Sequence, residues 1–270
     1  MDAKSSNASA PHLHGGSSVA AHHWKRTIAL LPLGGVCLWQ SGFNALGLFA
    51  ASLIGGLAAE TLAGTFLKKR IKLLDGSTVL NSFLFALLLP SQAPYGMAAG
   101  GAFFGFLIGR EIFGGMAAGP FQPALAARVL FEACFPWVFS PDAVIFGNGG
   151  LAAAALLAGA VFLLFQKLIT WDTPLIYWAA LSVLFLSSGS GAAAFFSPFV
   201  LFSAFFLLTD PSSAPLSVLG RRIFAGTAAM AVFLFNPGGG ASSPFVCGLL
   251  TAEILTPWLD RLIRPAARLA

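Results

Sequence analysis

The sequence predicts an all-α polytopic membrane protein with about ten transmembrane segments. Of its 270 residues, 57% are hydrophobic and only 9% are charged, which excludes an ordinary soluble globular domain. The apolar residues are gathered in runs separated by short polar loops. Several runs reach the length of about 20 residues that an α-helix needs to cross the hydrocarbon layer.

The apolar runs follow one another along almost the whole chain. They cover residues 26–42, 45–67, 76–89, 95–113, 119–138, 148–168, 174–188, 192–209, 221–236 and 244–263. Residues 1–23 are polar and lack the apolar stretch of a signal peptide, so we expect a disordered cytoplasmic tail. Its histidines have no cysteine or carboxylate at a metal-binding spacing, and a solvated tail is favoured over a metal site: His12, His14, His22 and His23.

Lysine and arginine indicate the orientation of these segments. Placing the N-terminus in the cytoplasm puts Arg26, Arg110 and the basic clusters 68–70 and 221–222 at the inner ends of segments. Both termini are then cytoplasmic, and only Arg128 falls well inside a run. The net charge of +5 therefore reflects membrane topology and does not indicate a nucleic-acid partner.

The third run is short and its sequence recurs. A helix over Gly76–Leu89 would reach about 21 Å, against about 30 Å of hydrocarbon. Residues 79–94 align without a gap with residues 200–215, and both copies end in Pro-Ser-x-Ala-Pro. Because the third and eighth segments run in opposite directions, the sequence predicts an inverted repeat of five plus five segments, 24–143 and 144–270. Such paired interrupted segments point to a transporter-like site between the repeats.

Charged side chains inside the apolar runs are candidate functional groups, because burying a charge in a membrane is costly. Arg128 and Glu132 are four residues apart, and we expect them to neutralise each other on one helix face. The remaining carboxylates lack such a local partner or lie at the inner ends of segments, and we predict that they line an ion path: Glu60, Asp210, Glu253 and Asp260. Asp260 is followed by Arg261, so an interfacial pair is its alternative explanation. Asp75 has a simpler explanation as the N-cap of the third helix.

Other residues have structural explanations. Gly101, Gly105 and Gly109 recur every four residues and predict one face of the fourth segment for close helix packing. The cysteines lie in apolar runs without Cys-x-x-Cys spacing, which indicates buried thiols: Cys37, Cys134 and Cys247. We find no catalytic triad, zinc-protease motif, P-loop or Rossmann fingerprint, so no residue is predicted to be catalytic and no metal site is predicted.

Several motifs together resemble one family. They are Asp75-Gly76-Ser77, Gly109-Arg110-Glu111-Ile112-Phe113-Gly114-Gly115, Pro120-Phe121-Gln122-Pro123-Ala124, Thr209-Asp210-Pro211-Ser212-Ser213-Ala214-Pro215 and Pro257-Trp258-Leu259-Asp260-Arg261. In this order, from Lys25 to Arg264, the chain resembles the RnfD/NqrB membrane subunits of Rnf complexes and of sodium-pumping NADH:quinone oxidoreductase.

The resemblance implies a ten-helix subunit with a urea-transporter-like inverted repeat in the bacterial cytoplasmic (inner) membrane. Such a subunit works in a complex that couples electron transfer to Na⁺ or H⁺ movement, so it is part of a translocase and not an enzyme by itself. The implied partners are the other membrane subunits of the complex and the lipid bilayer, with quinone as a further candidate near Gly114 and Gly115.

Family members carry FMN in phosphoester linkage to the threonine of a Ser-Gly-Ala-Thr motif, and this chain departs from the pattern there. After Asp142-Ala143-Val144 it continues Ile145-Phe146-Gly147-Asn148-Gly149-Gly150, and residues 141–169 contain neither serine nor threonine. A phosphoester needs a hydroxyl, so covalent FMN is not expected. Non-covalent FMN or riboflavin near Gly114, Gly115, Gly147, Asn148 and Gly149 stays open. The alternatives are a stand-alone channel or facilitator for a small solute, and a scaffold subunit without cofactors.

Overall fold

A computed structural model describes residues 19–66, 75–113, 119, 121–138, 144–147, 149–189, 197–211, 213–215, 217–235 and 242–263. Within these ranges every regular element is a helix and there is no strand. Each of the ten predicted apolar runs contains one of these helical segments. The prediction of an all-α protein is therefore confirmed.

The helices are as follows. The first half contains α1 (Val19–Ser41), α2 (Phe43–Phe66), α3 (Ser77–Leu87), α4 (Tyr95–Phe106) with its π-helical continuation η2 (Leu107–Glu111), α5 (Pro123–Cys134) and the short 3-10 helix η3 (Pro136–Val138). The second half contains α6 (Gly150–Phe165), α7 (Asp172–Ser187), α8 (Pro198–Phe202) with its π-helical continuation η5 (Ser203–Leu207), α9 (Val218–Phe235) and α10 (Ser242–Ile263).

The first helix begins earlier than predicted. Residues 19–23, which the sequence assigned to the disordered tail, form the first turn of α1. Ala20 and Ala21 are strong helix formers, and His23 is buried against the rest of the bundle, so both local propensity and packing extend the helix. The rest of the predicted tail lies outside the described residues.

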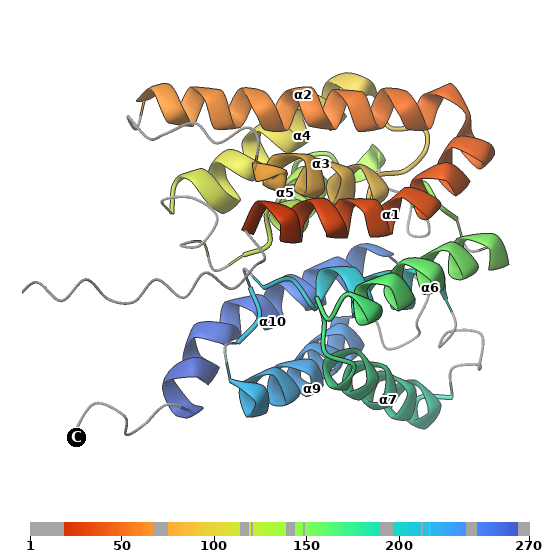
Figure 1. Ribbon diagram of the computed structural model, residues 1–270, viewed down its shortest axis with the longest axis vertical. Coiled ribbons are helices and arrows are strands. Elements are labelled where there is room, and N and C mark those ends of the chain that lie inside the picture. The colour runs from red at the N-terminus through yellow and green to blue at the C-terminus, as the bar shows by residue number, and fades with distance from the viewer. Residues whose placement is uncertain are drawn as a thin grey trace, which may run out of the picture.

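Four contacts between helices in the first half have counterparts in the second. In the first half α1 packs on α3, α2 packs on α3 and α4, and α4 packs on α5. In the second half α6 packs on α8, α7 packs on η5 and α9, and α9 packs on α10. The halves meet through α1 against α6 and through α5 against α10. Figure 1 shows the first-half helices in the upper part of the view and the second-half helices in the lower part.

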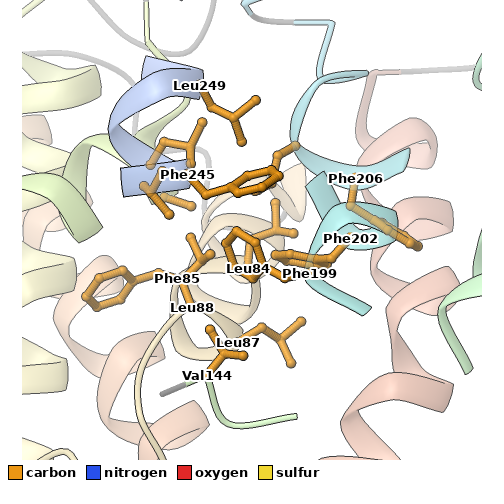
Figure 2. Close-up of a cluster of buried hydrophobic side chains, with 14 of the residues drawn as sticks. Leu84, Phe85, Leu87, Leu88, Val144, Phe199, Phe202, Phe206, Phe245 and Leu249 are labelled. Carbon is orange, nitrogen blue, oxygen red and sulfur yellow. The ribbon is translucent and has the colours of Figure 1, made fainter. Parts of the chain in front are cut away.

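The two short helices meet inside a buried apolar cluster. Figure 2 shows Leu84 and Leu87 of α3 close to Phe199 and Phe202 of α8, with Phe245 of α10 beside them. Phe146, in the loop before α6, also joins this cluster. The centroid of its ring lies 6.4 Å from that of Phe199 and 5.4 Å from that of Phe202. In the described part of the chain, the point where the two helices meet is therefore filled by apolar side chains.

The outer surface of the helices is apolar, as expected for a protein in contact with lipid. By length and composition alone, α2 and α9 could each cross a membrane, while α3, α6 and α7 are shorter apolar helices. Five tryptophans that the sequence places near segment ends are exposed, which suits side chains at the membrane–water interface: Trp24, Trp39, Trp137, Trp171 and Trp258.

The glycine face of α4 and η2 makes the close contacts that its spacing predicts. A Cβ on Gly105 would lie 2.2 Å from the Cβ and 2.3 Å from the Cα of Ala127 on α5. A Cβ on Gly101 would lie 2.6 Å from the ring of Phe85 on α3. Because backbone atoms stand in the way at Ala127, α4 and α5 can approach this closely only with glycine at position 105.

Replacing Gly105 with alanine is expected to lower the free energy of unfolding by about 1–3 kcal/mol, because the new methyl group forces the two helices apart. The measurement is unfolding of the detergent-solubilised chain by sodium dodecyl sulfate. Gly96→Ala is the matched control on the same helix, since no atom lies within 4 Å of a Cβ built there. Equal effects of the two substitutions would contradict the packing explanation.

Candidate functional site

A buried ion pair joins the two halves of the chain. Arg26 of α1 and Asp210, which follows η5, have Nη1 and Oδ1 2.6 Å apart, and the Arg26 residue is only 1% exposed. Its Nη2 also donates a hydrogen bond to the carbonyl oxygen of Phe206 at 2.9 Å. A helix C-terminus carries unsatisfied carbonyls and partial negative charge, so a carboxylate there needs a cation. The guanidinium of Arg26 supplies a positive charge for Asp210 and a hydrogen-bond donor for the carbonyl oxygen of Phe206.

A second buried cluster lies between α2, α3 and η2. The hydroxyl of Thr78 donates a hydrogen bond to Glu60, and Nη1 of Arg110 donates to Oγ1 of Thr78 at 3.0 Å. Nη2 of Arg110 is 3.9 Å from Oε1 of Glu60, and its Nε is 3.1 Å from Oε1 of Glu111. Glu60 therefore faces another helix, and a guanidinium lies beside it.

Glu253 of α10 has a different environment. It is 2% exposed, and its Oε2 accepts a hydrogen bond from the backbone N–H of Gln122 at 2.9 Å. The hydroxyl of Ser213 and the carboxylate of Asp210 are its polar neighbours. None of the ion pairs within the described ranges involves Glu253. This carboxyl therefore differs from Asp210 and Glu60, which each have an arginine.

A third buried arginine caps the other short helix. Nε of Arg128 donates a hydrogen bond to the carbonyl oxygen of Leu88, the C-cap residue of α3, at 3.0 Å. Its Nη1 lies 2.6 Å from Oε2 of Glu132, so the predicted pair on one helix face is confirmed. Both short helices thus end against a buried guanidinium, Arg128 for α3 and Arg26 for η5.

The four predicted ion-path residues do not form a single cluster. Asp210 and Glu253 are electrostatic neighbours, while Glu60 lies in the separate cluster with Arg110. Asp260 lies about two turns further along α10 than Glu253, is partly exposed, and has no hydrogen bond or ion pair to the other three in the described part of the chain. The prediction that these residues line one path stays a prediction.

The predicted cap of the third helix is wrong. Gly76, not Asp75, is the N-cap residue of α3, and no side-chain hydrogen bond caps this helix. Gly76 has φ +70°, a left-handed conformation that glycine adopts without strain. The chain therefore enters the helix through a glycine turn, and a Cβ at this position would approach the Trp24 indole to 2.9 Å.

The predicted flavin and quinone residues are only partly within the described structure. Gly114, Gly115 and Asn148 lie outside it. Gly147 and Gly149 lie beside the carboxamide of Gln40, whose oxygen is 3.4 Å from a Cβ built on Gly147. The preceding side chains, Val144, Ile145 and Phe146, are buried in the core. The described part of this loop has no hydroxyl, so it does not fit a phosphoester-linked FMN.

Sequence reasoning overlooked the basic half of this site. Arg26 and Arg110 served as topology markers at the inner ends of segments, and His23 was assigned to the tail. The signal that could have identified them is the number of acidic residues inside apolar runs, because buried carboxylates need cations from somewhere in the fold. Gln122 carried no signal, since its contribution to Glu253 comes from the backbone N–H.

His23 lies near the Arg26–Asp210 ion pair, one turn before the membrane span that the sequence predicts from residue 26. It is 5% exposed, and neither ring nitrogen has a hydrogen-bond partner among the described residues. Burial lowers the pKa of His23 below its ordinary value of about 6.5, and the nearby Asp210 carboxylate opposes this only in part.

The lowered pKa of His23 predicts a pH dependence of stability. Below about pH 6.5 the unfolded chain binds a proton that the folded chain does not, so stability falls as the pH falls. The His23→Leu variant should lose this dependence, reducing the slope by up to about 1.4 kcal/mol per pH unit. Unfolding by sodium dodecyl sulfate between pH 5.5 and 8 measures it. An unchanged slope in the variant would show that His23 titrates equally in both states.

These observations define a helical membrane protein whose buried charges lie between packed helices. The chain belongs to the NQR2, RnfD, RnfE family, whose sequence profile matches residues 6–146 and 142–268. The resemblance inferred from the motifs is therefore confirmed.

Three relatives are similar over most of their length. The D subunit of a Na⁺-translocating ferredoxin:NAD⁺ oxidoreductase complex of Acetobacterium woodii is 28% identical, over 95% of this chain and 93% of the relative. The D subunits of ion-translocating oxidoreductase complexes are 29% identical in Methanosarcina acetivorans (86% of this chain, 85% of the relative) and 30% identical in Pseudomonas aeruginosa PAO1 (82% and 83%). The first alignment is 295 positions long, more than the 270 residues of this chain, so that relative has segments that are missing here.

Proposed function

We propose that this chain is an RnfD-type integral membrane subunit in a complex that couples electron transfer to Na⁺ or H⁺ translocation. The observation that carries this proposal is the similarity, over more than four-fifths of both chains, to proteins named as the D subunits of ion-translocating oxidoreductase complexes. The other membrane subunits of such a complex are the partners, and the complex as a whole is the translocase.

We further propose that the two halves are inverted repeats on a urea-transporter-like scaffold. The pattern of helix contacts supports this, because four contacts within the first half have counterparts in the second: α1 on α3 matches α6 on α8, α2 on α3 matches α7 on η5, α2 on α4 matches α7 on α9, and α4 on α5 matches α9 on α10. The contacts between the halves pair α1 with α6 and α5 with α10, the helices that a two-fold axis would exchange. A repeat with an odd number of segments places its two copies in opposite orientations, as the positive-inside rule also favours.

One side-chain contact supports the same correspondence. The gap-free alignment makes Ser82 and Ser203 counterparts, and its spacing extended backwards pairs Gly56 of α2 with Tyr177 of α7. A Cβ on Gly56 would lie 2.6 Å from Oγ of Ser82, and the hydroxyl of Tyr177 lies 3.2 Å from Oγ of Ser203. The same two positions therefore meet in both halves, once by close packing and once through a hydrogen bond.

The arrangement of charges supports a closed ion pathway. With the N- and C-termini in the cytoplasm, the Arg26–Asp210 pair and the Glu60 cluster lie toward the inner face of the bacterial cytoplasmic membrane. Asp210 and Glu60 are held by arginines, and apolar side chains fill the contact between α3 and α8. Ion movement then requires a rearrangement of these contacts, which a redox-driven change of charge in the complex would supply.

The cofactor proposal is narrower than the one for the family. This chain offers no hydroxyl for covalent FMN at the loop around Gly147, so any flavin it holds is bound non-covalently. Gly147 and Gly149 permit close approach of a planar ring, and Gln40 is the polar side chain beside them. Quinone near Gly114 and Gly115 remains a proposal from the family resemblance alone.

The test is purification of the tagged chain from its native membrane in mild detergent. We expect other membrane subunits to copurify, and a flavin absorbance that acid precipitation releases into the supernatant. A chain that purifies alone and carries a small solute across liposome membranes would overturn the proposal in favour of a facilitator. Complete absence of flavin would remove the redox role from this subunit while leaving its place in the complex to the copurification result.

A further inference from the structure

We infer that Glu253 is a proton-binding carboxylic acid at the junction of the two halves, and that it carries its proton in the closed arrangement described above. The inference names the ion at one site of the proposed translocation pathway. That Glu253 is protonated follows from its surroundings alone, while a role for this proton in translocation rests on the proposed function.

The position of Glu253 makes it a meeting point of three segments. It lies on α10, next to the loop before α5 and the loop that follows η5. The first loop contributes the backbone N–H of Gln122, which donates to Oε2, and the second contributes the hydroxyl of Ser213. Both loops belong to the motifs that identified the family, so the carboxyl of Glu253 connects the two halves of the chain.

Among the described residues, no cation is paired with Glu253. From α5, Arg128 and Glu132 pair with each other and lie near Cys247, almost two turns before Glu253 on α10. From the loop after η5 comes Asp210, a like charge whose own partner is Arg26. From α9, Arg222 pairs with Asp172 at 3.2 Å. Since an unpaired buried carboxylate is very costly, the neutral acid is the stable form here.

The neutral acid also suits the polar groups beside it. The side-chain Oε1 and Nε2 atoms of Gln122 are buried and have no hydrogen-bond partner in the described structure, and the hydroxyl of Ser213 lies beside the Glu253 carboxyl. A protonated carboxyl supplies an O–H donor that an ionised one lacks. Ser213 neighbours Glu253, and its hydroxyl oxygen can accept as well as donate, so protonation places a donor beside an acceptor.

The same geometry favours a proton over a metal ion. Hard cations such as Mg²⁺ and Ca²⁺ take six or more oxygen ligands, about three times what one carboxyl group supplies. Oε2 of Glu253 already accepts an N–H group, which would point its hydrogen at a cation bound to that oxygen. A proton needs one carboxyl oxygen and one acceptor, and both are present.

Infrared spectroscopy of the purified full-length chain tests this inference directly. The difference between wild type and Glu253→Gln should contain a carboxylic acid C=O stretch that shifts on transfer to D₂O. Its intensity should fall about tenfold per pH unit above the pKa of the group and should not change when NaCl replaces choline chloride. The Asp260→Asn variant, altered two turns away on the same helix, should retain the band.

Two results would overturn the inference. A spectrum in which wild type and Glu253→Gln show the same carboxylic acid signal would mean that Glu253 is ionised. Loss of the band on addition of NaCl at constant pH would assign the site to Na⁺ instead. If Glu253→Gln does not fold, Glu253→Asp provides the comparison, because it keeps the acid and changes the frequency of its band. None of these readouts needs partner subunits, so failure here is separate from failure to copurify.

Discussion

Replacing Arg26 with methionine is expected to lower the free energy of unfolding by about 3–5 kcal/mol, one of the largest single effects in this protein. The substitution keeps most of the side-chain volume and removes the charge. It leaves the Asp210 carboxylate and the Phe206 carbonyl oxygen buried at a helix C-terminus without their donors. Unfolding of the purified chain by sodium dodecyl sulfate, followed by circular dichroism, measures the loss.

A neighbouring residue and a double variant separate the ion pair from general effects. Lys25→Met removes a positive charge at the adjacent position, where the ammonium group donates an exposed hydrogen bond to Gln166, and should change stability by about 0.5 kcal/mol or less. The double variant with Met at position 26 and Asn at position 210 should be more stable than the single Arg26→Met variant, because no unpaired charge remains. Additive effects of the two substitutions would show that the pair contributes no coupling.

The Arg128→Met substitution should have a similarly large effect, about 3–5 kcal/mol. Arg128 is fully buried, and its guanidinium serves both the carbonyl oxygen of Leu88 at the end of α3 and the carboxylate of Glu132. Removing it leaves the carbonyl of Leu88 without its donor and the partly buried carboxylate of Glu132 without its cation. The same detergent titration measures the change.

Arg222→Met is the matched comparison for Arg128, because it also breaks an arginine–carboxylate pair. The Arg222 side chain is 54% exposed, and its partner Asp172 lies 3.2 Å away at the start of α7. Exposed pairs contribute about 1 kcal/mol or less, since water and salt screen the charges. If Arg222→Met proved as costly as Arg128→Met, burial would not be the reason for the large effect.

The two buried arginines also bear on the proposed function. Each holds the C-terminal end of a short helix, and the two short helices meet through the apolar cluster of Figure 2. Movement of either helix would have to break these contacts. Variants at Arg26 and Arg128 are therefore expected to alter coupling in the assembled complex as well as stability.

Much of the fold was predictable because each membrane segment is a continuous apolar stretch of the sequence. Ten apolar runs gave ten helical segments, since a continuous apolar stretch in lipid must satisfy its backbone hydrogen bonds within itself. The Gly101–Gly105–Gly109 face and the Arg128–Glu132 pair were predictable for the same reason, because both depend only on helical spacing. The interruption of the third segment was likewise visible in its length and in the proline that follows it.

The sequence by itself determined the membrane class, the helices, the family and three of the buried acids, Glu60, Asp210 and Glu253. It did not identify Glu111, which is buried, or show that Asp260 is partly exposed. Only the tertiary structure decided which cation each acid receives, because Arg26 and Asp210 are far apart in the chain and meet through the packing of α1 against the second half. The structure also placed apolar side chains, not a polar path, between α3 and α8, and left Glu253 as a buried acid without an arginine in the described part of the chain. Partners that are far apart in the chain depend on how the helices pack, and the spacing of residues along the chain does not predict this packing.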